Sequence, residues 1–337
     1  MSAKATIVAP SNIAFIKYWG ARDLHRVIPS NPSISMTLRR CYTRTTVEHL
    51  EGDAHEVRWR AGQSQEAGGF EKPPPAFEER VLSHLDHLRR ITGSGGAFRV
   101  ATENSFPAAA GIASSASGFA ALTLAVLAAL ERETSPEECS TLARQSGSGS
   151  AARSVFGGYV EWPFGRQETD AYAFPIAPAD HWDLRDVVAL VATSPKKTSS
   201  LDGHRLAKTS RYFRVRQRRL PDRLQEVRQA LAARDFERLG EAVETEAVDL
   251  HCIAMTSEPP IYYWQPGTLE VLAAVRDLRN EGVGAWSTMD AGPNVHVICQ
   301  PQDEDRVVEC LESLPSVTST IRDGVGTGPL AENEHLF

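Results

Sequence analysis

The sequence predicts a protein that mixes strands and helices and folds as two domains. Its 337 residues suit one large or two ordinary domains, and a hydrophobic content of 42% is enough for a buried core. Polar and apolar residues alternate through parts of the N-terminal region, as they do in strands, whereas apolar residues later recur at helical spacing. The chain turns polar and basic after the strand Val187–Thr193, so we expect domains at residues 1–193 and 194–337.

The N-terminal region is expected to contain most of the strands. Residues from Thr6 onward form a strand pattern followed by a turn. The alternation in Ile28–Leu38 resumes at Thr43–Glu48, which predicts a hairpin. Residues 62–75 are rich in glycine, proline and charge and suit an exposed excursion. A helix is predicted over Ala76–Ile91, and a strand over Ala97–Thr102.

Helices predominate in the rest of the chain. Ser135-Pro136-Glu137-Glu138 is typical of a helix N-terminus, with proline at the first helical position. Glu258-Pro259-Pro260 interrupts the helical pattern, and the glycines of Gly324–Pro329 lack the helix that a dinucleotide-binding loop needs after them. The predicted elements are helices at Phe119–Glu131, Leu206–Arg219, Leu224–Ala233 and Phe236–Ala254, another helix through Leu269–Leu278, and a strand at Val295–Cys299.

Charge and cysteine content restrict the class of protein. The formal charge of −7 disfavours a nucleic-acid partner, because such proteins usually carry a basic face, although a local basic cleft stays open. The five cysteines are far apart with no Cys-x-x-Cys pair, which suits reduced thiols better than disulfides or a zinc site. The N-terminus lacks the apolar core of a signal peptide, and no run approaches a membrane span. We therefore expect a cytoplasmic protein without a membrane partner.

The stretch Asn104–Leu122 contains small, uncharged residues from Ala108 to Gly118 before it turns helical at Phe119. Small side chains let a backbone approach a ligand, and a loop that opens a helix presents unpaired N–H groups to an anion. Ser114 and Ser115 at the junction can cap the helix, contact phosphate or ligate a metal. A phosphate-binding loop is therefore predicted, with an alanine-rich packing helix as the alternative. It is not a Walker motif, since no Gly-Lys-Ser/Thr follows.

Three charged residues stand in unusual settings. Lys17 sits among apolar and aromatic residues, where a lysine either has an anionic partner or extends its ammonium group past its neighbours to solvent. Arg153 ends a row of small polar residues and suits a carboxylate or phosphate, although that row could also be a linker. Asp290 lies between an extended segment and a turn, where a turn-capping role is the alternative to a functional one.

Four motifs together resemble the mevalonate diphosphate decarboxylase family of the GHMP kinase superfamily, and they occur in matching order over nearly the whole chain. They are Asn12-Ile-Ala-Phe-Ile-Lys-Tyr-Trp-Gly20, the loop Phe106–Ser117, Gly147–Ser154 followed by Phe156-Gly157-Gly158, and Met289-Asp-Ala-Gly-Pro-Asn294. The resemblance implies an α+β fold with a ribosomal-protein-S5-like N-terminal domain, a ferredoxin-like C-terminal domain, and the active site in the cleft between them. Relatives are commonly homodimers.

The resemblance also implies a reaction. ATP would phosphorylate the tertiary 3-hydroxyl of a mevalonate phosphate, after which phosphate and carbon dioxide leave and an isopentenyl product forms. Asp290 matches the family's catalytic aspartate, Lys17 the lysine beside it, and Arg153 the arginine that holds the substrate carboxylate. Relatives that phosphorylate mevalonate without decarboxylating it lack this trio, so a decarboxylase is favoured.

The remaining site residues are assigned by the same resemblance. Mg²⁺ is expected on the nucleotide, with Ser115 as a protein ligand by position only. Substrate contacts are expected from Tyr18, Ser148, Ser150 and Ser200, and ATP contacts from Ala108, Ala109, Ala110, Gly111, Ala113, Ser114 and Ser115.

Two departures from the family pattern bear on the substrate. The family commonly has lysine after Tyr-Trp-Gly and arginine after the serine that corresponds to Ser200, whereas this chain has Ala21 and Leu201. Both missing cations lie by the terminal phosphates of the substrate in bacterial diphosphate enzymes. A charged hydrogen bond contributes about 1.5–3 kcal/mol, so two losses would weaken binding of a diphosphate by about two decades or more. Mevalonate 5-phosphate, which gives isopentenyl phosphate, is therefore the predicted substrate.

Several alternatives stay open. Replacement cations would leave the diphosphate as the substrate, and the candidates are Arg22, Lys196, Lys197, His204 and Arg205. The chain could instead be a nucleotide-binding protein without catalytic activity, although the retained trio argues against this. A sugar or homoserine kinase of the same superfamily would not need Arg153 to hold a leaving carboxylate.

Overall fold

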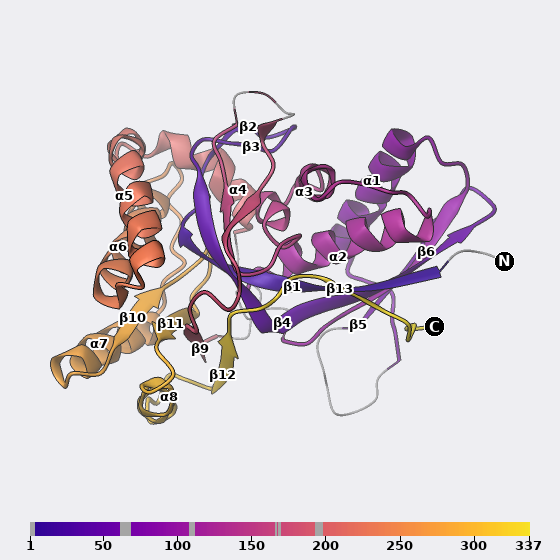
Figure 1. The fold of residues 1–337 in the computed structure, drawn as a ribbon. Helices are drawn as coiled ribbons and strands as arrows, with labels where there is room; N and C mark the ends of the chain where they lie inside the picture. The colour runs from indigo at the N-terminus through magenta and orange to yellow at the C-terminus, as the bar shows by residue number, and fades with distance from the viewer. Residues whose placement is uncertain (1–3, 61–68, 108–111, 166, 168–169, 193–197) are drawn as a thin grey trace.

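The computed structural model describes residues 4–60, 69–107, 112–165, 167, 170–192 and 198–337. Two sheets organise this part of the chain (Figure 1). The first has seven strands in the order β13-β1-β4-β6-β5, with β7 pairing with both β4 and β8. The second has four strands in the order β10-β11-β9-β12. Because nearly all strand pairs are antiparallel and helices pack on both sheets, the α+β prediction is confirmed.

The N-terminal half places its helices on one side of the large sheet (Figure 1). Helices α1 and α2 cover a core that includes Val47 and Phe98. The elements are β1 (Lys4–Ile16), β2 (Ala21–Asp23), β3 (Ile28–Pro29), β4 (Ser33–Leu50), β5 (Glu56–Arg60), α1 (Pro75–Thr92), β6 (Ala97–Asn104), α2 (Ser114–Ala129), α3 (Pro136–Arg144), a 3₁₀ turn (Gly149–Ala152), β7 (Tyr159–Trp162) and β8 (Phe174–Ala177).

The C-terminal half builds the second sheet and most of the long helices. Its elements are β9 (Arg185–Leu190), α4 (Ser200–Leu206), a 3₁₀ turn (Ala207–Thr209), α5 (Phe213–Ala233), α6 (Phe236–Met255), α7 (Pro266–Asn280), β10 (Ala285–Thr288), β11 (Val295–Cys299), α8 (Glu304–Glu312), β12 (Ser319–Gly324) and β13 (Leu330–Glu332). Strand β13 returns to the large sheet and pairs with β1, with Thr6 opposite Glu332. The exact domain boundary stays a prediction, and β9 already belongs to the second sheet.

The end of β1 lies where the two halves meet. Ile13, Phe15 and Ile16 are fully buried and belong to one apolar cluster with residues of β9 and α5, such as Val188 and Val227. Burial of such side chains contributes about 1.5–3 kcal/mol each, so this junction is a continuous core and not a loose contact. The residue that follows β1 is therefore held in the interior between the two halves.

The predicted hairpin within residues 28–48 is wrong. Strand β4 runs without a turn from Ser33 to Leu50 and pairs along β1 with register shifts. The main-chain N–H groups of Arg39, Arg40 and Cys41 donate to the carboxylate of Asp323, at 2.8, 2.9 and 2.8 Å. Because a distant side chain satisfies these donors, the chain keeps its direction where the sequence suggested a reversal.

Two helix boundaries also differ from the predictions. Helix α2 begins at Ser114, not at Phe119, because serine and alanine are small enough for the first turn, and Ala113 precedes it in the left-handed region at φ 40°. Helix α5 is continuous across the predicted break between Arg219 and Leu224 and has Pro221 inside it. Packing of its apolar face overrides the local penalty of the proline. The predicted helix at Leu206–Arg219 begins only at Phe213.

Other predictions for the chain are confirmed. Helices α1, α3, α6 and α7 and strands β6 and β11 lie where the sequence patterns predicted them. The Ser135 hydroxyl accepts a hydrogen bond from the N–H of Glu138 at 3.2 Å and caps α3. All five cysteines have free thiols.

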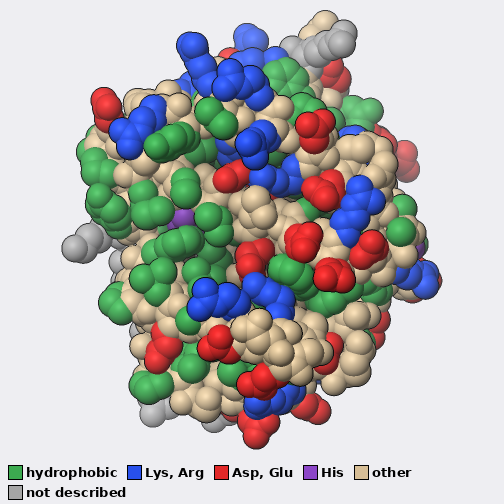
Figure 2. Space-filling view, turned by 90° about the vertical axis from the view of Figure 1, so that its left-hand side faces the viewer, with side chains coloured by type: hydrophobic (Ala, Val, Ile, Leu, Met, Phe, Trp, Pro, Cys, Tyr) green, Lys and Arg blue, Asp and Glu red, His purple; other side chains and the backbone are tan. Residues whose placement is uncertain are grey.

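Surface features vary between parts of the molecule. Among the described residues, no helix combines the length and apolarity that crossing a bilayer requires. Figure 2 shows the side on which α5, α6 and α7 lie. Hydrophobic side chains gather on one half of that face, and basic and acidic groups are interspersed on the other.

Candidate active site

Lys17 follows β1 directly and lies in the interior. Its side chain is 1% exposed, and Nζ donates to Oδ1 of Asp290 at 2.8 Å. A lysine this deeply buried requires a compensating anion, because an unpaired ammonium in the interior is very costly. Asp290 supplies that anion, so Lys17 does not extend its ammonium group to solvent.

Asp290 lies just after β10, at the start of the turn that leads into β11. Its main-chain carbonyl accepts from the N–H of Gly292 at 2.8 Å, which holds the turn. The side chain bonds to Lys17 and remains 26% exposed. The carboxylate therefore bridges a buried cation and an accessible surface, and the turn itself is held by the backbone.

Arg153 caps the short 3₁₀ turn and is buried beneath the same region. Its guanidinium donates to Oγ of Ser35 at 2.9 Å, Oγ of Ser33 at 2.5 Å and Oδ1 of Asn12 at 3.1 Å. These hydrogen-bond partners are all neutral, so they orient the guanidinium without neutralising it. Its charge remains available to an anion.

The three charges shift one another's pKa values. Burial lowers the pKa of Lys17, and the attraction of Asp290 only partly opposes this effect. Burial alone would raise the pKa of Asp290, but Lys17, His296 and Arg153 together hold it below its ordinary value. Burial lowers the pKa of Arg153 to about 10. Asp290 is therefore ionised at neutral pH and can accept a proton or a hydrogen bond.

Tyr18 and Ser148 connect the trio to the rest of the predicted site. The Tyr18 ring stacks on His204 with centroids 4.0 Å apart and meets the edge of Trp162 at 4.9 Å. Burial raises the pKa of Tyr18, so its hydroxyl remains a neutral donor. Ser148 Oγ lies 3.2 Å from Oγ of Ser115. The predicted substrate side and the predicted ATP side therefore meet at this pair of hydroxyls.

Two other predicted substrate contacts take different positions. Ser150 lies in the 3₁₀ turn, and its carbonyl accepts from Nδ2 of Asn12 at 3.3 Å. Ser200 is the first residue of α4, which Ser199 caps by accepting from the N–H of Asp202. Asn12 therefore bonds both to Ser150 and to the guanidinium of Arg153, which its Oδ1 helps to orient.

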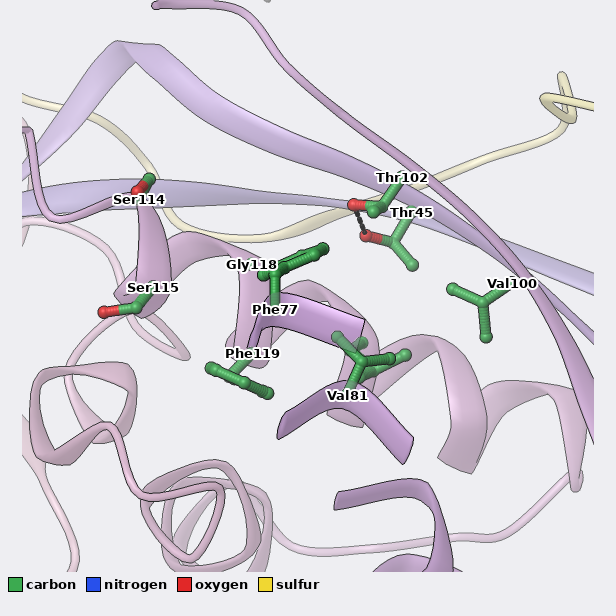
Figure 3. Close-up of a pocket in the computed structure, with 10 residues that line it drawn as sticks. Thr45, Phe77, Val81, Val100, Thr102, Ser114, Ser115, Gly118 and Phe119 are labelled. Atoms are coloured by element: carbon green, nitrogen blue, oxygen red, sulfur yellow. Dashed lines mark hydrogen bonds between the residues drawn. The ribbon is translucent and has the colours of Figure 1, made fainter. Parts of the chain in front are cut away.

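A pocket adjoins the N-terminus of α2 (Figure 3). The predicted ATP residues Ser114 and Ser115 line it, and Ala113 immediately precedes the helix. Ala108, Ala109, Ala110 and Gly111 lie outside the described residues. The other lining residues come from β4, α1, β6 and α2, and they are Thr45, Phe77, Val81, Val100, Thr102, Gly118, Phe119 and Leu122.

Sequence analysis missed the apolar part of this pocket and the groups that orient Arg153. Phe77 and Val81 lie on the apolar face of α1 and were indistinguishable from ordinary core residues. Ser33 and Ser35 did carry a signal, because residues two apart in a strand point to the same face. Two small polar side chains on one buried face indicate a polar partner opposite them.

Comparison with known proteins identifies the family. Residues 9–173 match a model described as the diphosphomevalonate decarboxylase-like N-terminal domain, and residues 187–331 match the mevalonate 5-diphosphate decarboxylase C-terminal domain. The chain belongs to the mevalonate diphosphate decarboxylase family. The predicted membership of this ATP-dependent enzyme family, with its GHMP kinase fold, is thereby confirmed.

Relatives within the family match almost end to end. The diphosphomevalonate decarboxylase of Candida albicans is 32% identical, with 98% of this chain and 99% of that protein covered. The phosphomevalonate decarboxylase of Haloferax volcanii is 33% identical, with 99% and 100% covered. Family members therefore include proteins named for either phosphorylated substrate.

Solved structures of family members share the fold. The mevalonate diphosphate decarboxylase of Staphylococcus aureus has a TM-score of 0.91 at 32% identity, with 99% of both chains covered. A structure described as MDDEF in complex with MVAPP, AMPPCP and magnesium has a TM-score of 0.89 at 32% identity, with 98% of this chain and 99% of that chain covered. ATP and Mg²⁺ as the expected co-substrate and metal are thus confirmed at the level of the family.

Proposed function

We propose that this chain decarboxylates mevalonate 5-phosphate, consuming ATP and releasing isopentenyl phosphate, ADP, phosphate and carbon dioxide. The observation that carries the substrate choice is the lack of cations at two positions, where the chain has Ala21 and Leu201. Ala21 is buried in β2 with a side chain too short to reach a phosphate, and Leu201 adds no charge to α4. A substrate with less negative charge at that end is the better match.

Nearby cations that could compensate have other contacts. Arg22 donates to the carbonyl of Gly165 at 2.5 Å, and its guanidinium lies over the Phe164 ring. Arg205 pairs with Asp202 at 3.4 Å. His204 uses Nδ1 to accept from the N–H of Gly20 at 3.0 Å. Lys196 and Lys197 lie outside the described residues. These contacts support the monophosphate over the diphosphate.

The proposed mechanism assigns one task to each charged group. Asp290 accepts the hydrogen bond of the tertiary 3-hydroxyl and takes its proton as the phosphoryl group arrives. Lys17, 2.8 Å from that carboxylate, stabilises the negative charge on the transferring group. Arg153 holds the substrate carboxylate that leaves as carbon dioxide. The charges are already oriented in the protein, so little rearrangement is needed during the reaction.

ATP would bind with its phosphates at the N-terminus of α2, where unpaired N–H groups favour an anion. The adjoining pocket is lined largely by apolar residues, which suit the flat faces of a base. Mg²⁺ supplies charge compensation for the phosphates, and the hydroxyl of Ser115 is the candidate protein ligand. The described residues contain no cluster of three His, Cys, Asp or Glu side chains that could hold a metal.

The second candidate is the diphosphate, giving isopentenyl diphosphate. Several relatives named diphosphomevalonate decarboxylase, including those of Candida albicans and Schizosaccharomyces pombe, support it. The Haloferax volcanii protein supports the monophosphate at a similar identity of 33%. Overall sequence similarity therefore does not distinguish the monophosphate from the diphosphate as substrate. The distinction rests on the charge of the residues near the terminal phosphate of the substrate.

A competition experiment tests the substrate choice. Both mevalonate phosphates are offered together, and ADP and carbon dioxide are measured for each. We expect a higher kcat/KM for the monophosphate, and a higher value for the diphosphate would refute the proposal. The double variant Ala21→Lys, Leu201→Arg should shift the ratio toward the diphosphate by about tenfold or more, since each charged contact contributes about 1.5–3 kcal/mol. Arg205→Ala is the matched control and should leave the ratio unchanged.

We also propose that the protein is a cytoplasmic homodimer. The free cysteines support a reducing compartment. Exposed hydrophobic side chains on the C-terminal half, including Tyr262 at 72% and Leu269 at 54%, support a subunit contact there. Light scattering after size-exclusion chromatography measures the mass directly, and a monomer at micromolar concentration would contradict the dimer.

A further inference from the structure

Three buried side chains surround the main chain of Lys17, and they come from outside the strand that carries it. Strand β1 ends at Ile16, so the N–H and carbonyl of Lys17 lie beyond the last paired residue of the sheet. Asn31, Arg216 and Glu246 bond to these groups, and we call these three residues the Lys17 clamp. A buried main chain needs such partners, but backbone or water could also have supplied them.

The clamp closes on both sides of the residue. Glu246 Oε1 accepts from the N–H of Lys17 at 3.1 Å. The Lys17 carbonyl accepts from Nη2 of Arg216 at 2.8 Å and from Nδ2 of Asn31 at 2.9 Å. Arg216 also donates to Glu246 and, at 3.3 Å, to Oδ1 of Asn31. The ring of bonds fixes the backbone at the point where the lysine side chain begins.

A second contact holds the clamp itself. Arg223 donates to Oε2 of Glu246 and to Oδ2 of Asp249, both at 2.6 Å. Glu246 is fully buried between two arginines. Ion pairs buried this deeply often add little net stability, because removing the charges from water costs as much as their attraction returns. Net stability therefore does not account for these ion pairs, and their contact with the backbone of Lys17 indicates that they hold this backbone in place.

Helix α6 also holds the strand that leads to Asp290. Glu244 Oε2 accepts from the N–H of Ser287 at 3.0 Å and from its hydroxyl at 2.7 Å, in β10. Gly240 lets the helix approach this strand, because a Cβ there would lie 2.0 Å from the Trp286 ring. The same helix therefore fixes Lys17 through Glu246 and the strand before Asp290 through Glu244.

We propose that Asn31, Arg216 and Glu246 are positioning residues that set the ammonium group of Lys17 against Asp290 for phosphoryl transfer. The ammonium group is at the end of four rotatable bonds, so its position depends on the orientation of the backbone from which the side chain extends. A misplacement of the ammonium group by about 1 Å lowers the rate by about 100-fold, and we expect a loss of this size when the clamp is disrupted. This inference rests on the proposed role of Lys17 and does not depend on which mevalonate phosphate is preferred.

The alternative is that Arg216 and Glu246 merely join the two halves of the molecule. Arg228 provides a matched control, because it lies on the same helix α5 and pairs with Glu161 of β7 at 2.8 and 2.5 Å. That pair also connects the two halves, but it makes no contact with Lys17. Arg216 is 2% exposed and Arg228 is 42% exposed, so a purely structural role would lower the stability of Arg216→Met more, but it would leave kcat of the folded enzyme similar in both variants.

The experiment compares the steady-state kinetics of the two variants with the mevalonate phosphate that the wild type turns over faster. Arg216→Met should lower kcat by about 100-fold with both KM values within about threefold, whereas Arg228→Met should keep kcat within about threefold. Similar kcat values for the folded variants, or a loss confined to KM, would overturn the proposal.

Should Arg216→Met fail to fold, Asn31→Ala is the second variant. It removes one bond to the Lys17 carbonyl without leaving a buried charge, and it should still lower kcat by about tenfold. An unchanged kcat in Asn31→Ala would likewise overturn it.

Failure of the proposed function gives a different result. If the wild type turns over neither substrate, the proposed function fails, and crystal structures of the variants then test the clamp. The contact of 2.8 Å between Lys17 Nζ and Asp290 Oδ1 should be lost in Arg216→Met, or in Asn31→Ala if that variant alone folds, and kept in Arg228→Met. An intact contact in the clamp variant would refute positioning.

Discussion

The proposed site has two parts, called here the reaction half and the nucleotide half, and they hold charge in different ways. In the reaction half, Lys17 and Arg153 are buried and oriented by several side chains, and Asp290 pairs directly with Lys17. In the nucleotide half, a helix N-terminus with Ser114 and Ser115 adjoins a pocket lined largely by apolar residues. In the proposed function, the first half supplies fixed charge, and the second supplies backbone donors for a ligand that brings its own charge.

The difference teaches where each kind of substitution should act. Lys17 and Asp290 are proposed to act on the transferring phosphoryl group, so loss of either charge should lower kcat. Arg153 is proposed to hold the carboxylate of the substrate, so its loss should raise the KM for that substrate. A pocket that only receives the nucleotide contributes equally to the ground and transition states, so changes there should raise the KM for ATP. Four predictions test this division, beginning with the largest expected effect, and a control variant with a small effect follows them.

Asp290→Asn should produce the largest loss. It removes the proton acceptor while keeping nearly the same shape, so kcat should fall by about 10²–10⁴-fold or more. ATP affinity, measured by calorimetry with a non-hydrolysable analogue, should stay within about threefold, because Asp290 belongs to the reaction half. Turnover near the wild-type rate would exclude the assigned role.

Arg153→Gln should weaken binding of the substrate acid. The variant keeps a hydrogen-bonding group but loses the charge, and a charged hydrogen bond contributes about 1.5–3 kcal/mol, or about 10–150-fold in affinity. The KM for the mevalonate phosphate should rise accordingly while the KM for ATP changes little. A larger effect on ATP than on the acid would show that Arg153 belongs to the nucleotide half.

The pH profile of kcat should be flat on the acidic side. The pKa of Asp290 lies below its ordinary value of 3.8, so the carboxylate stays ionised and kcat should not fall between about pH 8 and pH 5. Lys17→Met removes the strongest attraction that holds this pKa down, so any residual activity should show an acid limb at higher pH. The check is kcat at saturating substrates, with circular dichroism as the control for folding. A limb in the wild type near pH 6 would contradict an Asp290 assignment.

Gly118→Leu should act on the nucleotide half alone. Gly118 lines the pocket in α2, and an added Cβ there meets nothing within 4 Å, so leucine would occupy space proposed for ATP. The KM for ATP should rise by about tenfold or more with kcat within about threefold, as expected for loss of uniform binding. The opposite split would place Gly118 in the reaction half.

Gly118→Ala is the matched control for Gly118→Leu, and we expect it to have the smallest effect of these variants. Alanine leaves most of the space open, and it should stabilise the helix by about 0.5–1 kcal/mol because glycine is the more flexible residue in the unfolded chain. Urea unfolding measures this gain. A loss of stability would show that the site is more crowded than the structure indicates.

The sequence was most informative about the reaction half. A lysine among aromatic residues is rare enough to be noticed by itself, whereas an aspartate before a turn is common and was singled out through the family resemblance. Their meeting across 273 residues was inferred only from the family resemblance, since no local pattern encodes a contact at that separation. The nucleotide half gave a clear signal only where small residues cluster, because Phe77 and Val81 look like core positions.

Two of the errors in the predicted fold share one cause. The hairpin expected within residues 28–48 is absent because Asp323, far along the chain, bonds the backbone of Arg39, Arg40 and Cys41. Helix α5 runs through Pro221 because its apolar face packs against α6. In both cases a partner that local sequence cannot reveal outweighed the local preference.

The pairing of β13 with β1 constrains the order of events during synthesis. Thr6 is made before all of the intervening residues, and its partner Glu332 is made after them. During translation the outer edge of the first sheet therefore stays unpaired, open to a chaperone or to another nascent chain. Strand β1 gains its partner β13 only after the C-terminal half has been made, so the N-terminal sheet reaches its final form after the second sheet has been synthesised.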